Sequence, residues 1–405
     1  MSAYAFYCRS YQKIMKLATN FLDWNGPELL RGPGSVQELP RLIKAHGLQK
    51  VLVVTDPGLM KIGLPKTLLD GLEQAEIAYA LYDKTQPNPT IENIEQARTL
   101  YSEQNCQGLI AFGGGSPMDC AKGVGARLVR PNKSIPQLRG LLKVRKKLPP
   151  FYAIPTTAGT GSETTLAAVV SNPETHEKYP INDTKLRPRY AVLDPELTVG
   201  LPKHITSTTG MDALTHAVES YIGRSNTKDT EKKALDATRL IFANLETAYN
   251  DGANIEAREN MLLASFYAGA AFTRAYVGYV HGIAHNLGGM YNTPHGLANA
   301  VILPYVLDYY GEAAHTRLAR LAEAAGITKQ GQSDAEKALA FIAEIRAMNA
   351  RMGIPDSFDF IKEGDIPTIA ARALKEANPL YPVPKLMRLA DCVGVIRKLY
   401  PVVQQ

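Results

Sequence analysis

The sequence predicts an α/β fold followed by a helical domain, and two patterns along the chain carry this prediction. Residues 51–193 alternate short apolar runs with helical stretches, which is typical of a parallel sheet covered by helices. Beyond Leu201 this strand pattern fades, and apolar residues recur at helical spacing. A chain of 405 residues is also longer than one compact core usually holds. We therefore expect an N-terminal extension over residues 1–27, an α/β domain over 28–200 and an all-helical domain over 201–405.

The expected elements follow in order from these patterns. Helical periodicity is clear at 91–105 and 117–129 in the first half, and at 230–249 and 256–272 in the second. The strand pattern ends at the sequence DPEL, residues 194–197. The apolar runs that we expect to form strands are 51–55, 77–82, 108–112, 151–154, 167–170 and 190–193.

Composition excludes several classes of protein. Apolar residues make up 45% of the chain and charged residues 21%, which is the balance of a globular protein and not of a disordered one. The formal net charge of +6 is mild for this length. A nucleic-acid binder would carry a longer basic face with interleaved aromatic residues, so we expect no nucleic-acid partner. One basic cluster, which we interpret as a solvated loop with a phosphate or partner contact as the alternative, comprises Lys143, Arg145, Lys146 and Lys147.

Cysteine spacing and the N-terminus indicate a soluble, cytoplasmic protein. The four cysteines are far apart and form no CxxC pair, so neither disulfides nor a thiolate zinc site is predicted. The N-terminus lacks the features of a secretory signal. Residues 275–307 contain no charged residue, but His281, His285 and Asn299 would be costly facing lipid. We expect a buried segment lining a polar site, and no membrane partner.

A glycine-rich loop follows the predicted strand at 108–112. It reads GGGSPMDCAKG, residues 113–123, and leads into a helix with Pro117 in its first turn. Glycines let the backbone approach an anion, and a helix start offers free N–H groups and a favourable dipole. A pyrophosphate would lie on Gly114, Gly115 and Ser116. The loop is not GxGxxG, so a tight strand-to-helix turn is the alternative.

A second loop, PTTAGTGSE at 155–163, follows the next strand and carries three threonine hydroxyls, those of Thr156, Thr157 and Thr160. The carboxyl ends of adjacent parallel strands meet at one edge of a sheet. Hydroxyls and open backbone amides at this edge favour a dinucleotide site.

The strand VLVVT ends in Asp56. A carboxylate there can accept hydrogen bonds from an adenosine ribose and would repel a 2′-phosphate, which favours NAD over NADP. The alternative is an aspartate that starts a turn before Pro57 and Gly58.

Four of the eight histidines lie in otherwise apolar sequence. Asp212 and His216 are spaced i,i+4, as are His281 and His285, so each pair shares one face of a helix. His295 follows His281 by fourteen residues. Each histidine alone would more often be a hydrogen-bonded core residue. Together they favour a site for a divalent transition metal such as Fe, Zn, Mn or Ni.

Five motifs occur in the order GGGSPMD, IPTTAGTGSE, GMDALTH, VHGIAHNLG and YNTPHG, within a resemblance that covers roughly residues 28–400. In this order they resemble the iron-containing (group III) alcohol dehydrogenases, the family of lactaldehyde reductase. The resemblance implies a dehydroquinate-synthase-like architecture, with an NAD-binding domain, a helical domain and a metal in the cleft between them. It implies NAD and Fe(II), with zinc or another divalent ion as the alternative, a small alcohol or aldehyde substrate, and a homodimer or higher homo-oligomer.

The resemblance also implies roles for single residues. His285 would stand near the nicotinamide as a non-ligand, and its place one helical turn after His281 predicts that it relays the proton released in the reaction. Lys178 would lie near the nicotinamide ribose, and Phe272 would form an aromatic wall. The metal ligands would be Asp212, His216, His281 and His295. The remaining NAD contacts would be Asp56, Asn88, Gly114, Gly115, Ser116, Thr156, Thr157 and Thr160.

These features predict a metal-dependent oxidoreductase that moves a hydride between NAD(H) and a small primary alcohol, aldehyde or diol. One alternative is a lyase of the dehydroquinate-synthase type, whose polyanionic substrate would demand many cations near the metal. The metal motifs here carry almost none. The other alternative is a non-catalytic metal- and nucleotide-binding protein, which would bind NADH without turnover.

Overall fold

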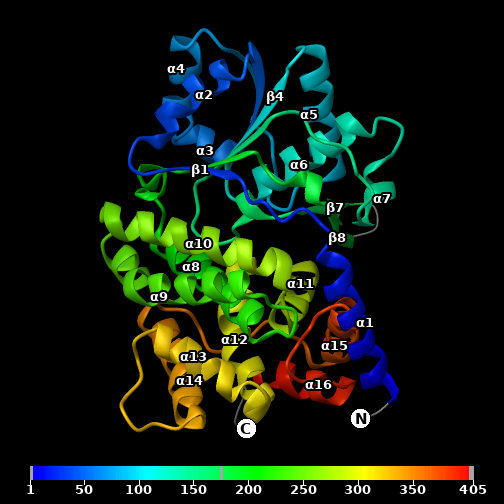
Figure 1. Cartoon of the computed structure of the whole chain (residues 1–405), viewed down its shortest axis with the longest axis vertical. Helices are drawn as coiled ribbons and strands as arrows, with labels where there is room; N and C mark the ends of the chain where they lie inside the picture. Colours follow the sequence, from blue (N-terminus) through cyan, green and yellow to red (C-terminus); the bar gives the residue numbers. More distant parts are fainter. Residues whose placement is uncertain (1–2, 174–176, 401–405) are drawn as a thin grey trace. The chain divides into compact units, whose positions relative to one another are not determined.

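The computed structural model describes residues 3–173 and 177–400 and traces two compact units (Figure 1). The α/β unit comprises Asp23–Gly200 and Ala253–Leu262. The helical unit comprises Met1–Leu22, Leu201–Gly252 and Leu263–Gln405. These units are groups of residues in mutual contact, and the predicted domain boundaries stay predictions.

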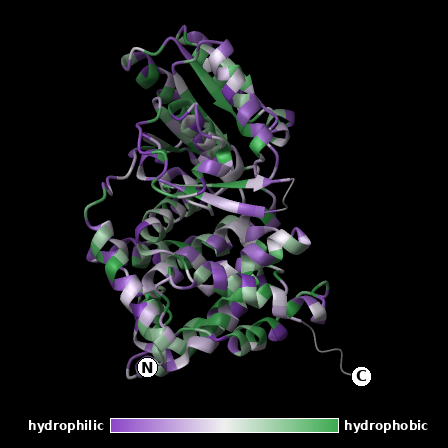
Figure 2. Cartoon of the chain, turned by 90° about the vertical axis from the view of Figure 1, so that its right-hand side faces the viewer, coloured by the Kyte–Doolittle hydropathy of each residue, from purple (hydrophilic) through white to green (hydrophobic). Residues whose placement is uncertain are grey.

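The α/β unit is built on a six-stranded sheet with the order β1-β9-β6-β4-β2-β3, and all its strand pairs are parallel. The central strands β4 and β6 are buried along their whole length, which explains why the sequence shows continuous apolar runs there. Figure 2 shows the strands of this sheet largely as hydrophobic ribbon. The predicted parallel sheet is therefore confirmed. Its strands are β1 (Glu28–Arg31), β2 (Lys50–Val54), β3 (Ala78–Tyr82), β4 (Gly108–Gly113), β6 (Phe151–Pro155) and β9 (Tyr190–Leu193).

Alternate residues of the strands enter two cores, one on each face of the sheet. Leu52 and Val54 of β2 share a core with residues of α5 and α6, whereas Val51 and Val53 share the other core with residues of α2 and α4. Both faces are therefore covered, as a parallel sheet requires. The helices are α2 (Leu39–Ala45), α3 (Pro57–Lys61), α4 (Lys66–Gln74), α5 (Ile91–Glu103) and α6 (Gly115–Val129).

A second sheet of three strands has the order β5-β8-β7. The apolar run at 167–170 forms β7 (Ala167–Asn172), which pairs antiparallel with β8 (Glu177–Asn182) and lies outside the parallel sheet. Strand β8 was not predicted, because its sequence EKYPIN is mostly polar and contains a proline. The short strand β5 (Gly140–Leu141) and helix α7 (Ile135–Leu138) complete this part. The predicted basic loop follows β5, outside any helix or strand.

The second half of the chain is helical, as predicted. The uncharged segment at 275–307 forms most of α11 and α12, which are largely buried. Asn292 ends α11 in a left-handed conformation with φ 55°, and Pro294 precedes the start of α12 at His295. Among the described residues, we find no helix that is long and apolar enough to cross a membrane. The helices are α8 (Lys203–Ile222), α9 (Lys228–Asn250), α10 (Ile255–Ala275), α11 (Tyr279–Tyr291), α12 (His295–Tyr310), α13 (His315–Ala324), α14 (Asp334–Arg351), α15 (Ile366–Ala377) and α16 (Leu389–Lys398).

Within the predicted N-terminal extension, Ala3–Thr19 form helix α1. The Arg9 guanidinium donates hydrogen bonds of 2.7 and 3.0 Å to the carbonyls of Val383 and Pro384. The Gln12 amide donates to the carbonyls of Pro379 and Tyr381 at 3.0 and 2.8 Å. Helix α1 is thus anchored on the segment between α15 and α16.

Candidate metal centre and nucleotide loops

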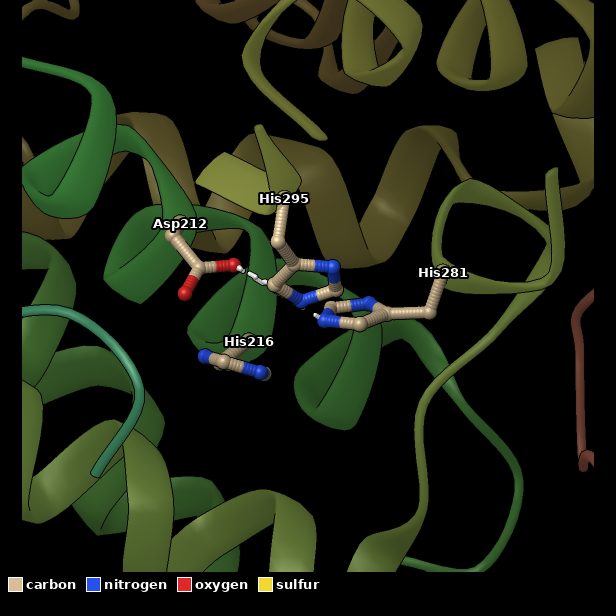
Figure 3. Close-up of side chains that lie close together, drawn as sticks. All are labelled: Asp212, His216, His281 and His295. Carbon is tan, nitrogen blue, oxygen red and sulfur yellow. Dashed lines mark ion pairs between the residues drawn. The ribbon is translucent and has the colours of Figure 1, made fainter. Parts of the chain in front are cut away.

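Four side chains from three helices converge in the helical unit (Figure 3). Asp212 and His216 come from α8, His281 from α11 and His295 from the start of α12, and one potential ligand atom of each lies within 4.8 Å of the others. Asp212 Oδ1 is 3.5 Å from His295 Nε2 and 3.9 Å from His281 Nε2. Two atoms bound about 2.1 Å from one ion lie at most about 4.2 Å apart, so these distances fit a shared divalent metal. Three imidazoles and a carboxylate are also suitable donors for a transition metal.

Helix α12 packs closely on α8, and this packing places His295 next to Asp212. A Cβ atom added at Gly296 would lie 2.5 Å from the carbonyl oxygen of Thr208, so only glycine permits this approach. The i,i+4 spacing on α8 places Asp212 and His216 on one face, as the sequence predicted.

Glu219 orients His281. Its carboxylate accepts from His281 Nδ1 at 2.7 Å, and from the backbone N–H groups of Gly278 and Val280 at 2.8 Å each. Because Nδ1 is engaged, Nε2 is the atom available to a metal. Burial, followed by the neighbouring His216, holds the pKa of His281 well below its usual value, so its imidazole is neutral. Burial also raises the pKa of Glu219 to about 7, and the two backbone N–H groups limit that rise.

Asn299 contacts three of the four converging side chains. Its side chain is fully buried in α12, and its Nδ2 donates to Asp212 Oδ1 at 2.7 Å. The same nitrogen lies 3.1 Å from His295 Nε2 and 3.2 Å from His281 Nε2. The sequence analysis assigned no role to Glu219 or Asn299, although each follows a predicted ligand by about one helical turn.

His285 lies beside the metal group but is not part of it. Its ring stacks on His295 with centroids 5.3 Å apart, and its Nδ1 is 2.7 Å from Glu376 Oε1. Tyr381 donates to the same carboxylate oxygen at 2.9 Å. Burial opposes ionisation of Glu376, but the charge and hydrogen bond of His285 and the hydrogen bond of Tyr381 outweigh it and hold the pKa of Glu376 below its ordinary value. The side chain of His285 is 39% exposed, so it connects this group to solvent.

Phe272 of α10 stacks on His216, with ring centroids 4.1 Å apart and an angle of 14° between the rings. The resemblance implied an aromatic wall at this position. The structure places the ring against a candidate metal ligand, and its role toward a cofactor stays a prediction.

The two predicted nucleotide loops meet in the α/β unit. A Cβ atom added at Gly114 would lie 3.3 Å from Thr157 Oγ1, and one at Gly115 would lie 3.2 Å from Thr160 Cγ2. Helix α6 begins at Gly115, so its first N–H groups lie where the two loops meet. The Ser116 hydroxyl also accepts from the backbone N–H of Asn88 at 3.1 Å. The residues brought together are Asn88, Gly114, Gly115, Ser116, Thr157 and Thr160, and Thr156 is buried at the end of β6.

Asp56 and Lys178 lie elsewhere in this unit. Asp56 caps α3, and its Oδ1 accepts from the backbone N–H of Leu59 at 3.0 Å. The aspartate therefore starts a turn, as the alternative interpretation expected, and its contact with a ribose stays a prediction. Lys178 lies on β8 opposite Ser171, and burial lowers its pKa.

Comparison with known proteins agrees with these features. Residues 27–195 match the family model "Iron-containing alcohol dehydrogenase", and residues 206–400 match the model of the C-terminal part of the same family. The chain is 40% identical to a 1,3-propanediol dehydrogenase of Klebsiella pneumoniae, over 86% of this chain and 90% of that protein. It is 35% identical to a lactaldehyde reductase of Escherichia coli K12, over 85% and 91% of the two chains.

A solved structure shares the fold as well. Sulfoacetaldehyde reductase of Bifidobacterium kashiwanohense, in complex with NAD⁺, matches with a TM-score of 0.84 and 28% identity, over 94% of this chain and 99% of that one. Two family models that together span most of the chain, and relatives named as a dehydrogenase and a reductase, favour an oxidoreductase over the lyase alternative. The chain belongs to the iron-containing alcohol dehydrogenase family and is an oxidoreductase.

Proposed function

We propose that this enzyme transfers a hydride between NAD(H) and a small primary alcohol, its aldehyde, or a diol. Fe(II) would be held by Asp212, His216, His281 and His295. The observation that carries the proposal is the convergence of one carboxylate and three imidazoles within 4.8 Å. A metal held there would act as a Lewis acid that polarises the oxygen of the substrate. Imidazole and carboxylate sites accept several divalent metals, so the choice of iron over zinc rests on the family.

The use of NAD is supported by the two loops and by a relative. The sulfoacetaldehyde reductase that shares this fold was solved with NAD⁺. In this chain the Gly114 loop and the Thr157 loop lie in contact at the start of α6. That arrangement offers backbone N–H groups and hydroxyls to a pyrophosphate.

His285 is the residue that we propose moves the proton. Oxidation of an alcohol releases a proton as the hydride leaves, and the acceptor must lie near the metal group yet reach solvent. His285 meets both conditions, because its ring stacks on His295 and its side chain is 39% exposed. Glu376 accepts from Nδ1 and would stabilise the charged ring that forms when Nε2 takes the proton.

The substrate class is proposed from the relatives, which are named for 1,3-propanediol, lactaldehyde and sulfoacetaldehyde. A panel of small alcohols, diols and aldehydes, tested with NADH or NAD⁺ after anaerobic loading with Fe(II), would identify it. Turnover of at least one such compound is expected. A protein that binds NADH and metal but turns over none of them would instead be the non-catalytic alternative.

Two further proposals rest on the family resemblance. We propose a cytoplasmic enzyme that assembles as a homodimer or higher homo-oligomer. Sedimentation of the purified protein tests the assembly, and a mass equal to the 44.2 kDa of one chain would contradict it.

Replacing Asp56 with serine should relax the choice of cofactor. Serine keeps a cap for α3 but removes the carboxylate that would bind the ribose and repel a 2′-phosphate. Hydrogen-bond and electrostatic terms on the order of 2 to 4 kcal/mol are involved. We expect the ratio of kcat/KM for NADPH to that for NADH to rise while the melting temperature stays unchanged. A wild-type enzyme that already uses both cofactors equally well would show that Asp56 has no such role.

Replacing Glu376 with glutamine should slow turnover without loss of metal. The amide keeps the size of the side chain, but it no longer fixes the proton on His285 Nδ1 or stabilises the charged ring. We expect kcat to fall roughly 10- to 100-fold, as for a misplaced catalytic group. The measurement is kcat at saturating NAD⁺ and alcohol, with metal content determined on the same sample. An unchanged kcat would show that Glu376 does not assist proton transfer by His285.

A further inference from the structure

A lysine is buried in the α/β unit where no charge is expected. Lys122 lies on α6 and its side chain is fully buried. Its Nζ lies 2.7 Å from the Ser162 carbonyl, 2.9 Å from Ser162 Oγ, 2.7 Å from Thr165 Oγ1 and 2.8 Å from the Ala167 carbonyl. An ammonium group has three N–H donors, so these four oxygens engage all of them.

Asp119, which lies one helical turn before Lys122, binds the same segment. One carboxylate oxygen accepts from the Ser162 hydroxyl at 3.1 Å, and the other accepts from the backbone N–H of Val169 at 3.2 Å. Ser162 therefore accepts from Lys122 and donates to Asp119. Burial lowers the pKa of Lys122 to about 8 and raises that of Asp119 to about 6, so both are mainly ionised at neutral pH.

Buried charges are costly unless they are paired and hydrogen-bonded, as Lys122 and Asp119 are. Here they join two segments that are far apart in sequence. Helix α6 starts in the first nucleotide loop, and Ser162 lies at the end of the second loop, 155–163. Gly123, which directly follows Lys122 on α6, packs against Ile94, so this helix is also fixed to α5. The two charges thus connect a rigid helix to the hydroxyl-rich loop.

We propose that Lys122 and Asp119 are positioning residues of the dinucleotide site, which hold the second loop against α6 so that the two loops bind one pyrophosphate. This inference rests on the proposed use of NAD(H). Lys122 itself would not touch the cofactor. It acts through Ser162, which fixes the loop that carries Thr157 and Thr160.

The test is a cycle of three variants, Lys122→Met, Ser162→Ala and the double variant, read by fluorescence titration of NADH with the metal-loaded protein. We expect Lys122→Met to raise the dissociation constant of NADH roughly 10- to 100-fold, with bound metal unchanged. Because both residues act through one contact, the double variant should bind NADH within about twofold of Lys122→Met alone. If the losses of NADH affinity in the two single variants add fully in the double variant, Lys122 and Ser162 do not act through one contact, and the inference is wrong.

A matched control separates positioning from loss of stability. Leu72 is buried on α4, in the core on the opposite face of the same sheet. Leu72→Ala should lower the melting temperature but leave the affinity for NADH near that of wild type. If Leu72→Ala weakens NADH binding as much as Lys122→Met does, or if Lys122→Met binds like wild type, the positioning role is wrong.

Asp119→Asn keeps the inference testable if Lys122→Met does not fold. This change preserves shape and removes one charge, and we expect the dissociation constant of NADH to rise about 3- to 10-fold, the size of one weakened hydrogen bond. An unchanged affinity would contradict the role of Asp119. A wild-type protein that binds no NADH would instead overturn the proposed function itself, so the two failures can be told apart.

Discussion

The His281→Ala enzyme is expected to lose both its bound metal and its turnover. His281 Nε2 is one of four potential ligand atoms, and its loss would also leave the buried Glu219 carboxylate without the imidazole that it orients. A metal contributes several kcal/mol of charge stabilisation to such reactions, so kcat/KM should fall on the order of 10³-fold or more. Elemental analysis and the rate of NADH oxidation, measured on one sample, test both parts.

The matched control for this prediction is His204→Ala. His204 is an exposed histidine on α8, the helix that also carries Asp212 and His216. This variant should keep metal and rate. In the wild-type enzyme a chelator should abolish turnover, and Fe(II) should restore it. A His281→Ala enzyme with wild-type metal content would remove His281 from the ligand set.

The His285→Ala enzyme is expected to keep its metal and its affinity for NADH while turnover falls roughly 10²- to 10⁴-fold, the usual span for a lost acid or base. His285 is not among the four converging ligand residues, and its Nδ1 is engaged by Glu376. The alcohol proton would then need a slower route to solvent.

Metal content decides how a slow His285→Ala enzyme is interpreted. Loss of metal would make His285 a ligand or a support of one, because supporting residues typically contribute about 10- to 100-fold to metal affinity. Normal metal with normal turnover would make it an ordinary histidine. If the relay is correct, Glu376→Gln should lower turnover in the same direction but by less, and His204→Ala should not change it.

The sequence predicted those parts of the fold that local patterns encode. Buried parallel strands such as β4 and β6 are continuous apolar runs, and glycines mark where α6 starts. The small sheet was not predicted, because β8 is polar and its pairing with β7 is set by contacts and not by periodicity. The run at 167–170 therefore appeared to belong to the parallel sheet.

Local patterns also predicted only part of the candidate metal centre and its surroundings. The i,i+4 pairs predicted the helices that carry His216 and His281, because helical spacing fixes which residues share a face. Glu376 is 91 residues from His285 in sequence, and only the tertiary fold brings them to 2.7 Å. Lys122 lies within the predicted helix at 117–129 and was given no role, because its partners follow it by 40 residues or more. Charges that are satisfied by distant backbone carbonyls leave no local signal.

We propose that a metal bound by Asp212, His216, His281 and His295 is required for hydride transfer to or from NAD. The most direct measurement is the rate of NADH oxidation by a small aldehyde across samples loaded to different metal contents, with metal per chain determined on each sample. We expect the rate to rise in proportion to bound metal and to vanish in the metal-free protein, while NADH still binds to it. Full turnover in protein shown to be free of metal would show that hydride transfer does not require a bound metal.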